Sequence, residues 1–348
     1  MARRLALGAL LIGCAALLDA LLPRLLDPYM FQILIYIGIN ITLAVSLNLV
    51  NGITGQFSIG HAGFMAIGAY VSAYITYFFG PGLATATPSG GPPSGIAGEF
   101  VLFGALLAGG LAAAGAGWVV GLPSLRLKGD YLAIVTLGFG EIIRVLILNI
   151  ETVGGARGFA GVPPLQKFSP VRGFFWVFLL AVATVIVSVR LVNSSYGRAM
   201  LAVREDEVAA EASGVNTTQT KVGAFVVGAF FAGMAGGLLG HYLQYLNPAM
   251  FTFVKSFEIL IMVVLGGMGS ITGSVLAAAI MTILPEALRG VKDYTPHNID
   301  PRMVLFSLLL IVLMLTRPTG LLGHREIWDV VPWRRRRHPA GPNSGGAA

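Results

Sequence analysis

Side chains that could carry chemistry are few in this sequence and stand far apart. Glu141 and Arg144 lie three residues apart in an apolar run. Residues at that spacing share one helix face, so this pair either forms a polar patch beside a solute path or neutralises itself and locks two helices together. Gln56, Ser58 and His61 lie in a glycine-rich stretch. They either line a path for a small solute or hydrogen-bond backbone groups that a bent helix leaves free.

The sequence lacks the motifs of an enzyme site. It has no Gly-x-x-x-x-Gly-Lys-Ser/Thr phosphate loop, no His-Glu-x-x-His and no Gly-x-Ser-x-Gly, and its one cysteine, Cys14, stands in an apolar run. Phosphate binding, zinc hydrolysis and serine hydrolysis each need such a cluster. We therefore expect no catalytic residue, metal or cofactor in the chain, and a membrane-embedded enzyme is disfavoured.

The elements that hold these residues are predicted to be membrane helices. Of the 348 residues, 55% are hydrophobic and 11% are charged, whereas soluble domains carry about 25% charged residues. The composition predicts an all-α integral membrane protein, a polytopic bundle of about ten transmembrane helices. The apolar runs are residues 5–22, 29–50, 64–79, 99–121, 131–150, 173–192, 222–246, 256–265, 271–288 and 303–316.

Two glycine-rich breaks interrupt the predicted helices. We call residues 51–63 the first break and residues 266–270 the second break; both are glycine turns between two spans. Irregular backbone at membrane depth is tolerated where it lines protein or a water-filled cavity. Gly266, Gly267 and Gly269 of the second break are therefore path candidates, together with the polar residues of the first.

The longest polar interruption is the charged loop, residues 196–221. Its middle, residues 204–212, has no Gly or Pro and predicts one short helix, and Gly214 suits the position just past the helix end. Ala209, Ala210 and Ala212 offer a flat face that a partner could approach. A charge run is commonly a solvated helix, but we favour docking to a cytoplasmic motor subunit. The charged residues of this candidate coupling site are Arg204, Glu205, Asp206, Glu207 and Glu211.

Basic residues predict the orientation. With the N-terminus inside, the inner loops hold fourteen Lys and Arg residues and the outer loops eight. The positive-inside rule then places the charged loop and both termini in the cytoplasm. We expect a retained N-terminal transmembrane helix in residues 1–28, a permease domain in residues 29–323, and a basic, disordered cytoplasmic tail in residues 324–348 that touches lipid rather than nucleic acid.

The charged loop resembles the EAA loop of ABC importer permeases, the coupling helix that sits in a cleft of the ATPase. The family pattern is Glu-Ala-Ala, three residues, then Gly. Ala209, Ala210 and Gly214 keep this spacing, while Val208 stands where the family has Glu, and Glu207 comes one place early.

Longer stretches resemble one branch of that family. Residues 47–64, 129–144 and 263–270 are similar to signature segments of the branched-chain amino acid permeases, of the LivM type rather than the LivH type, and the resemblance covers about residues 29–323. Residues 153–158 lack the Thr of the family motif Thr-Gly-Gly-x-x-Gly.

The resemblance implies an inner-membrane permease that imports leucine, isoleucine and valine. It also implies two ATP-binding subunits, a second, LivH-like permease and a periplasmic binding protein, with ATP bound by the partners. We expect specificity to rest mainly with that binding protein and no deep high-affinity pocket in this chain. Related permeases import urea or aromatic acids, which leaves the solute open. A secondary transporter with Glu141 or His61 as a proton carrier is the alternative from another class.

Overall fold

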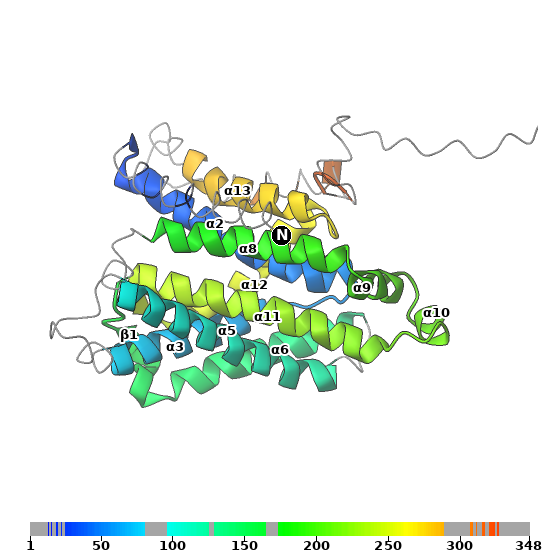
Figure 1. Ribbon diagram of the computed structural model, residues 1–348, viewed down its shortest axis with the longest axis horizontal. Coiled ribbons are helices and arrows are strands. Elements are labelled where there is room, and N and C mark those ends of the chain that lie inside the picture. Colours follow the sequence, from blue (N-terminus) through cyan, green and yellow to red (C-terminus); the bar gives the residue numbers. More distant parts are fainter. Residues whose placement is uncertain are drawn as a thin grey trace, which may run out of the picture.

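The computed structural model describes residues 25–80, 96–124, 129–164 and 173–288, with scattered positions from 13 to 22 and from 307 to 326. Figure 1 shows these residues as a bundle of long helices lying side by side. α9 and α10 project from one end of the bundle, and β1 lies at the opposite end. We call these the α10 end and the strand end.

The elements follow the chain from Pro28 onward. The long helices are α2 (Pro28–Asn48), α3 (His61–Tyr74), α5 (Ile96–Ser124), α6 (Asp130–Leu148), α8 (Phe174–Val192) and α11 (Thr217–Leu243). The shorter helices are α9 (Ser195–Glu205), α10 (Glu207–Ala212), α12 (Phe253–Gly266) and α13 (Ile271–Ala287). The remaining elements are the π-helical turns η1 (Leu49–Ile53) and η2 (Ile75–Phe79), the 3-10 turns η3 (Glu151–Val153), η4 (Gly155–Arg157) and η5 (Pro248–Phe251), and the paired strands β1 (Phe159–Ala160) and β2 (Tyr245–Leu246).

Six helices in the described part are long and apolar enough to cross a membrane. They are Pro28–Ile53, His61–Phe79, Gly98–Leu122, Tyr131–Leu148, Phe174–Val192 and Thr217–Leu243. α12 and α13, with 14 and 17 residues, are shorter and are joined by the second break, as the sequence predicts. The predicted runs at residues 5–22 and 303–316 lie largely outside the described residues. An all-α membrane bundle is thus confirmed, while the count of ten helices stays a prediction.

α11 begins five residues before its predicted start. The side chain of Asn216 accepts a hydrogen bond from the backbone N–H of Gln219 (2.9 Å) and so caps the helix at Thr217. Asn is among the preferred N-cap residues. The first turns of α11 therefore belong to the charged loop rather than to the apolar run that predicted the helix.

Close helix crossings form the centre of the bundle. A Cβ atom at Gly68 of α3 would lie 2.1–2.3 Å from backbone atoms of Gly233 in α11, and one at Gly236 would lie 2.0 Å from the carbonyl oxygen of Met65. Small residues let membrane helices approach to backbone contact, where dispersion replaces the hydrophobic effect as the attraction. α11 is accordingly the most enclosed span, with 78% of its apolar window buried.

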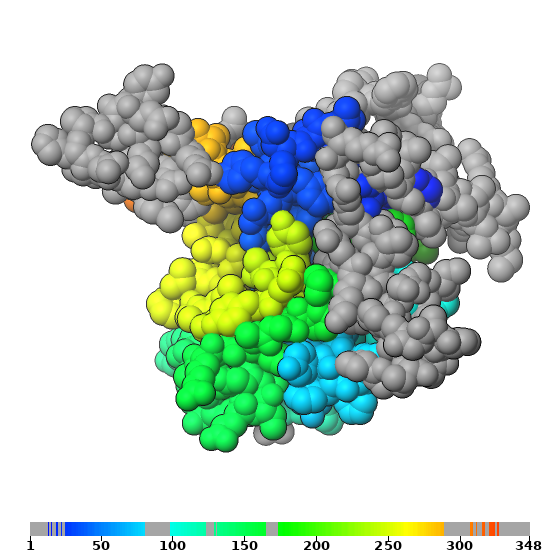
Figure 2. Space-filling view, turned by 90° about the vertical axis from the view of Figure 1, so that its left-hand side faces the viewer, coloured from blue at the N-terminus to red at the C-terminus, as the bar shows by residue number. Residues whose placement is uncertain are grey.

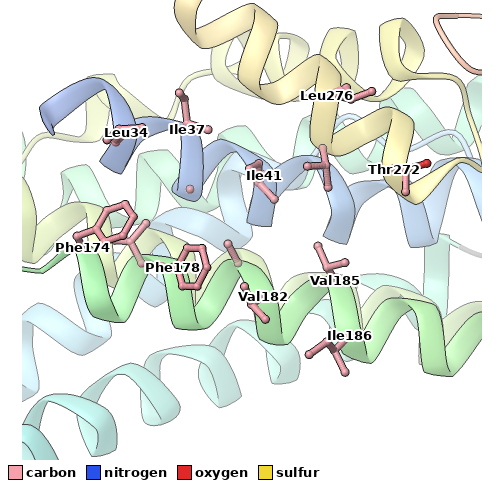
Figure 3. A pocket seen from close by; sticks show the side chains of 14 residues that line it. Leu34, Ile37, Ile41, Phe174, Phe178, Val182, Val185, Ile186, Thr272 and Leu276 are labelled. Atoms are coloured by element: carbon pink, nitrogen blue, oxygen red, sulfur yellow. The ribbon is translucent and has the colours of Figure 1, made fainter. Parts of the chain in front are cut away.

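An apolar groove of about 510 Å³ runs between α2, α8 and α13. Figure 3 shows Ile37 and Ile41 of α2 facing Phe178 and Val182 of α8. Thr272 is the one hydroxyl-bearing residue among those that line it. Charged groups pay a large desolvation cost on such a surface, so the groove suits hydrocarbon rather than a polar solute.

The strand end gathers several short elements. Figure 2 looks onto this end and shows the segment around β2 and η5, in yellow, between the start of α2, in blue, and the loop after α6, in green. β1 pairs antiparallel with β2, with Phe159 opposite Leu246 and Ala160 opposite Tyr245. The pairing ties the loop after α6 to the C-terminal end of α11.

Candidate functional site

The charged loop folds as two helices, so the predicted single helix over residues 204–212 is wrong. Asp206 ends α9 and starts α10 in an extended conformation, with φ −155° and ψ 112°. Its side chain accepts hydrogen bonds from the backbone N–H groups of Val208 (2.9 Å) and Ala209 (3.1 Å). An N-cap of this kind stabilises a helix start by about 0.5–2 kcal/mol. The capping preference of Asp206 outweighs the helix propensity of its neighbours.

α9 is anchored on both sides. Met200 and Val203 are buried, and Met200 packs with Leu49 of η1. The hydroxyl of Tyr196 donates a hydrogen bond to the backbone oxygen of Gln219 (2.9 Å), and burial raises the pKa of this phenol above its ordinary value. α9 is therefore fixed to the end of the α2–η1 segment and to the start of α11.

α10 is held against the first turns of α11 by its own polar side chains. The Lys221 ammonium pairs with the Glu207 carboxylate at 2.5 Å, and the Thr217 hydroxyl donates to Glu211 at 2.7 Å. Ala210 is 4% exposed. Two of the acidic residues assigned to docking are thus engaged within the chain, and they position α10.

The outward face of α10 differs from the predicted face of three alanines. Ala209 and Ala212 are exposed, but Ala210 faces inward, and Val208, at 70% exposure, occupies the outer surface instead. Successive residues are turned by about 100° around a helix, so Ala209, Ala210 and Ala212 do not share one narrow face. Gly214 is exposed with φ +84°, the left-handed conformation expected just past a helix end.

Arg204 joins the charged loop to the first break. Its Nη1 donates a hydrogen bond to the backbone oxygen of Gly52 (3.1 Å), while Nε and Nη2 donate to Glu205 (3.1 and 2.6 Å). The Glu205 side chain is 72% exposed, and Gly52 is buried. The guanidinium thus bridges a carboxylate on the surface and a carbonyl inside the bundle, which its planar fork of donors allows.

The two breaks contact each other directly. A Cβ atom at Gly52 would lie 2.2 Å from the backbone nitrogen of Gly269. Asn48, which is fully buried, accepts a hydrogen bond from the Gly269 N–H (2.9 Å) and donates one to the Ser270 carbonyl (3.0 Å). A position that can bear no side chain therefore joins segments more than 200 residues apart in the chain. Arg204, the first break and the second break form one connected series.

The second break is also tied to residues near the end of the chain. Gly267 ends α12, and a Cβ atom there would lie 2.4 Å from the carbonyl oxygen of Gly323. The backbone N–H of Leu321 donates to the Leu265 carbonyl at 2.8 Å. Glu326, just past the predicted domain boundary at residue 323, accepts hydrogen bonds from the first backbone N–H groups of α13. A carboxylate there complements the partial positive charge of the helix N-terminus.

The polar residues of the first break are buried, and most of them form hydrogen bonds within the chain. His61 shares a hydrogen bond of 2.9 Å with the Ser46 hydroxyl, and the Asn51 amide donates to the backbone oxygen of Ser58 at 3.1 Å. Gln56 is 4% exposed, and within the described residues neither atom of its amide has a hydrogen-bond partner. The hydrogen-bonding capacity of the Gln56 amide therefore remains for a solute or water.

Glu141 and Arg144 form the ion pair that their spacing predicts, at 2.6 Å between Nε and Oε2. The other carboxylate oxygen of Glu141 accepts a hydrogen bond from the backbone N–H of Phe253 (3.1 Å), the first residue of α12. The pair therefore joins α6 to the start of α12. Glu141 also lines a small cavity together with Ile59 and Gly63 of the first break.

Three residues that make these contacts were not predicted from the sequence as part of the site. They are Asn48, Asn51 and Thr136. The Thr136 hydroxyl accepts a hydrogen bond from the backbone N–H of Ile59 and so fixes α6 to the first break. Asn48 had a readable signal, because an amide inside an apolar run is costly unless it has a partner. The partner itself, 221 residues away, could not be read from the run.

Within the described residues, no group of three or more His, Cys, Asp or Glu side chains is placed to hold a metal ion. The contacts of the charged loop with the two breaks provide a mechanical connection between an exposed helix and the irregular backbone inside the bundle.

Comparison with known proteins gives one consistent result. The family model described as "Branched-chain amino acid transport system / permease component" matches residues 29–315. The high-affinity branched-chain amino acid transport system permease protein LivM of Escherichia coli is 36% identical over 313 residues, which is 82% of this chain and 68% of that protein. The probable LivM of Methanocaldococcus jannaschii is 28% identical over 85% of this chain and 94% of its own. The LivH permease of Escherichia coli is 28% identical over 83% of this chain and 92% of its own. No solved structure matches.

Proposed function

Because this chain belongs to the family of branched-chain amino acid transport permeases, we propose that it is the membrane subunit of an ATP-driven importer for leucine, isoleucine and valine. It spans the inner membrane with both termini in the cytoplasm. Two ATP-binding subunits, a second permease of the LivH type and a periplasmic amino acid-binding protein complete the importer. The similarity of the chain to both LivM and LivH supports a pair of permeases with a common fold.

The observation that carries this proposal is the construction of α10. Its inner face is fixed by the Lys221–Glu207 ion pair, and its outer face presents Val208, an apolar side chain that is 70% exposed. We infer that this exposed apolar side chain, on a helix that projects from the end of the bundle, is a contact point for a partner subunit. α10 thus has the form of a docking element for an ATPase cleft.

Movement of the docked ATPase then reaches the solute path through backbone contacts. A shift of α9 moves Arg204, which is bonded to the Gly52 carbonyl, and Gly52 lies against Gly269. Close-packed contacts transmit displacement because they cannot be compressed. One push at the charged loop would therefore act on both breaks together. A zwitterion crosses apolar surroundings at high cost, so opening irregular backbone at these breaks lowers the barrier to its passage.

The test uses Val208→Arg in the assembled importer, reconstituted with its ATPases and binding protein. Charge reversal at Glu207 or Glu211 is less informative because both carboxylates bond within the chain. Val208→Arg leaves those bonds intact and places a long cation on the docking face. We expect it to abolish association with the ATPase and ATP-driven leucine uptake, while Val208→Ala retains both.

Val254→Arg is the matched control, because Val254 is 51% exposed and lies on α12 at the strand end. This variant is expected to bind the ATPase normally. Wild-type binding and ATP-driven uptake in Val208→Arg would exclude the docking role. Uptake driven by a proton gradient without any ATPase would instead support the secondary transporter.

A further inference from the structure

A cavity of about 400 Å³ lies toward the strand end of the bundle, away from the charged loop. Leu239 and Leu243 line it from the last turns of α11, Thr282 from the last turns of α13 and Lys255 from the first turn of α12. All these turns are remote from α10 (Figure 1). In the proposed importer this is the side on which a solute arrives.

One part of the cavity wall is polar. The Asn40 amide donates a hydrogen bond to the Thr282 hydroxyl at 2.9 Å, which joins α2 to α13 across the cavity. The Lys255 ammonium pairs with the Glu258 carboxylate at 3.0 Å, and the Glu258 side chain is 49% exposed. Lys255 lines the cavity and Glu258 lies one turn further along α12, so this cation and anion match the two charges of an amino acid. Because the pair is partly solvated, exchanging it for solute contacts costs little.

The rest of the wall is largely apolar, with Tyr36 as its one further polar side chain among the described residues. Ile39 and Met65 are buried, and Leu239, Leu243 and Met250 complete the surface. Binding sites for small molecules combine such an apolar lining with a few placed polar groups, in volumes of about 300–1,000 Å³. Among the described residues that line the larger groove of Figure 3, Thr272 supplies a single hydroxyl and none is charged, so they offer nothing to a zwitterion.

We propose that this cavity is a substrate site of the permease itself, which receives an aliphatic amino acid on its way to the breaks. The carboxylate of the solute binds Lys255, its ammonium group lies toward Glu258, and its side chain packs against Met65 and Leu239. This inference rests on the proposed function and adds to it, because it assigns part of the selectivity to this chain. Specificity then does not rest with the binding protein alone.

The test measures binding of L-leucine to the permease–ATPase complex in lipid nanodiscs without the binding protein, by the ligand-dependent rise in melting temperature. L-leucinol, which lacks the carboxylate, is the comparison ligand. We expect L-leucine at millimolar concentration to stabilise the wild type, and L-leucinol to have little effect. Lys255→Gln should weaken leucine binding about tenfold, because one charge-assisted hydrogen bond is lost.

Three further variants separate the site from general effects. Arg157→Gln removes one exposed positive charge at the same end, outside the cavity lining, and should bind leucine as the wild type does. Lys255→Arg keeps the charge and should restore binding. Leu239→Ala leaves the polar wall intact and should weaken leucine about tenfold while leaving L-alanine unchanged, because the lost contact is to the branched side chain.

The outcomes distinguish a wrong assignment of the cavity from a wrong proposed function. Equal stabilisation by L-leucine and L-leucinol, or equal binding by the Lys255→Gln and Arg157→Gln variants, overturns the cavity assignment. So does the absence of leucine binding in a wild-type complex that imports leucine once ATP and the binding protein are supplied. If the complete wild-type importer fails to take up leucine, the proposed function itself fails.

Discussion

Replacing Gln56 by Leu is expected to stabilise the permease, although the substitution lies in the centre of the first break. The residue is 4% exposed, and neither amide atom has a hydrogen-bond partner among the described residues. Mutational data on proteins put the cost of burying an amide without hydrogen-bond partners at about 1–3 kcal/mol. Leu has a similar volume and no polar atom, so the free energy of unfolding should rise by about 1–3 kcal/mol.

Gln32→Leu is the matched control for this prediction. The Gln32 amide donates a hydrogen bond to the Tyr36 hydroxyl at 3.2 Å, so the same chemical change there removes a bond that is made. It should lower the free energy of unfolding by about 0.5–1.5 kcal/mol. The two variants therefore shift stability in opposite directions, which denaturant titration of the purified protein in mixed micelles would measure.

If Gln56→Leu destabilises the protein as much as Gln32→Leu does, the Gln56 amide has a hydrogen-bond partner and this prediction is wrong. A second measurement concerns function. An unpaired amide that is kept at a cost to stability is expected to serve the solute. ATP-driven leucine uptake by the Gln56→Leu importer should accordingly fall while the protein becomes more stable, and unchanged uptake would remove Gln56 from the path.

Three further predictions follow from close contacts in the fold. Gly68→Ala should cost about 1–3 kcal/mol of unfolding free energy because its Cβ meets the α11 backbone. At Gly104 a Cβ atom would have no described atom within 4 Å, so Gly104→Ala should be neutral or stabilising by up to about 1 kcal/mol. Thermal unfolding compares the two variants. Arg204→Met should leave ATPase binding and hydrolysis intact but reduce uptake, measured as solute moved per ATP hydrolysed, and an unchanged ratio would exclude the link. Lys221→Met removes the ammonium that pairs with the partly buried Glu207 carboxylate and should destabilise by about 1–3 kcal/mol, a loss that adding Glu207→Gln should largely recover in a double-mutant cycle.

Local patterns predicted a large part of this structure. Apolar runs gave the six described spans, and glycine clusters gave the two breaks. The i, i+3 spacing gave the Glu141–Arg144 ion pair. The left-handed Gly214 followed from its position after an alanine-rich helix. These features depend on residues close in the sequence, where helix geometry and backbone preference decide the outcome.

Features that depend on distant partners were not predicted. Asp206 is a strong N-cap residue, so the joint between α9 and α10 had a signal that the helix propensity of its neighbours obscured. The inward turn of Ala210 depends on the packing of α10 on α11. The contact of Gly52 with Gly269 depends on how α2 meets the α12–α13 pair. One sequence carries no information on which of many glycines will meet.

The acceptor of the Arg204 hydrogen bond is a main-chain oxygen, and this has a genetic consequence. Every amino acid supplies the same carbonyl, so no allele at position 52 removes the acceptor, and a charge swap can never repair a lost arginine. A side chain at position 52 instead collides with the Asn48 amide oxygen at 2.0 Å and with the Gly269 backbone nitrogen at 2.2 Å, so a smaller residue at position 48 relieves only one of the two clashes. A permease built in this way is thus free to change Glu205 while it keeps the same joint between Arg204 and the backbone.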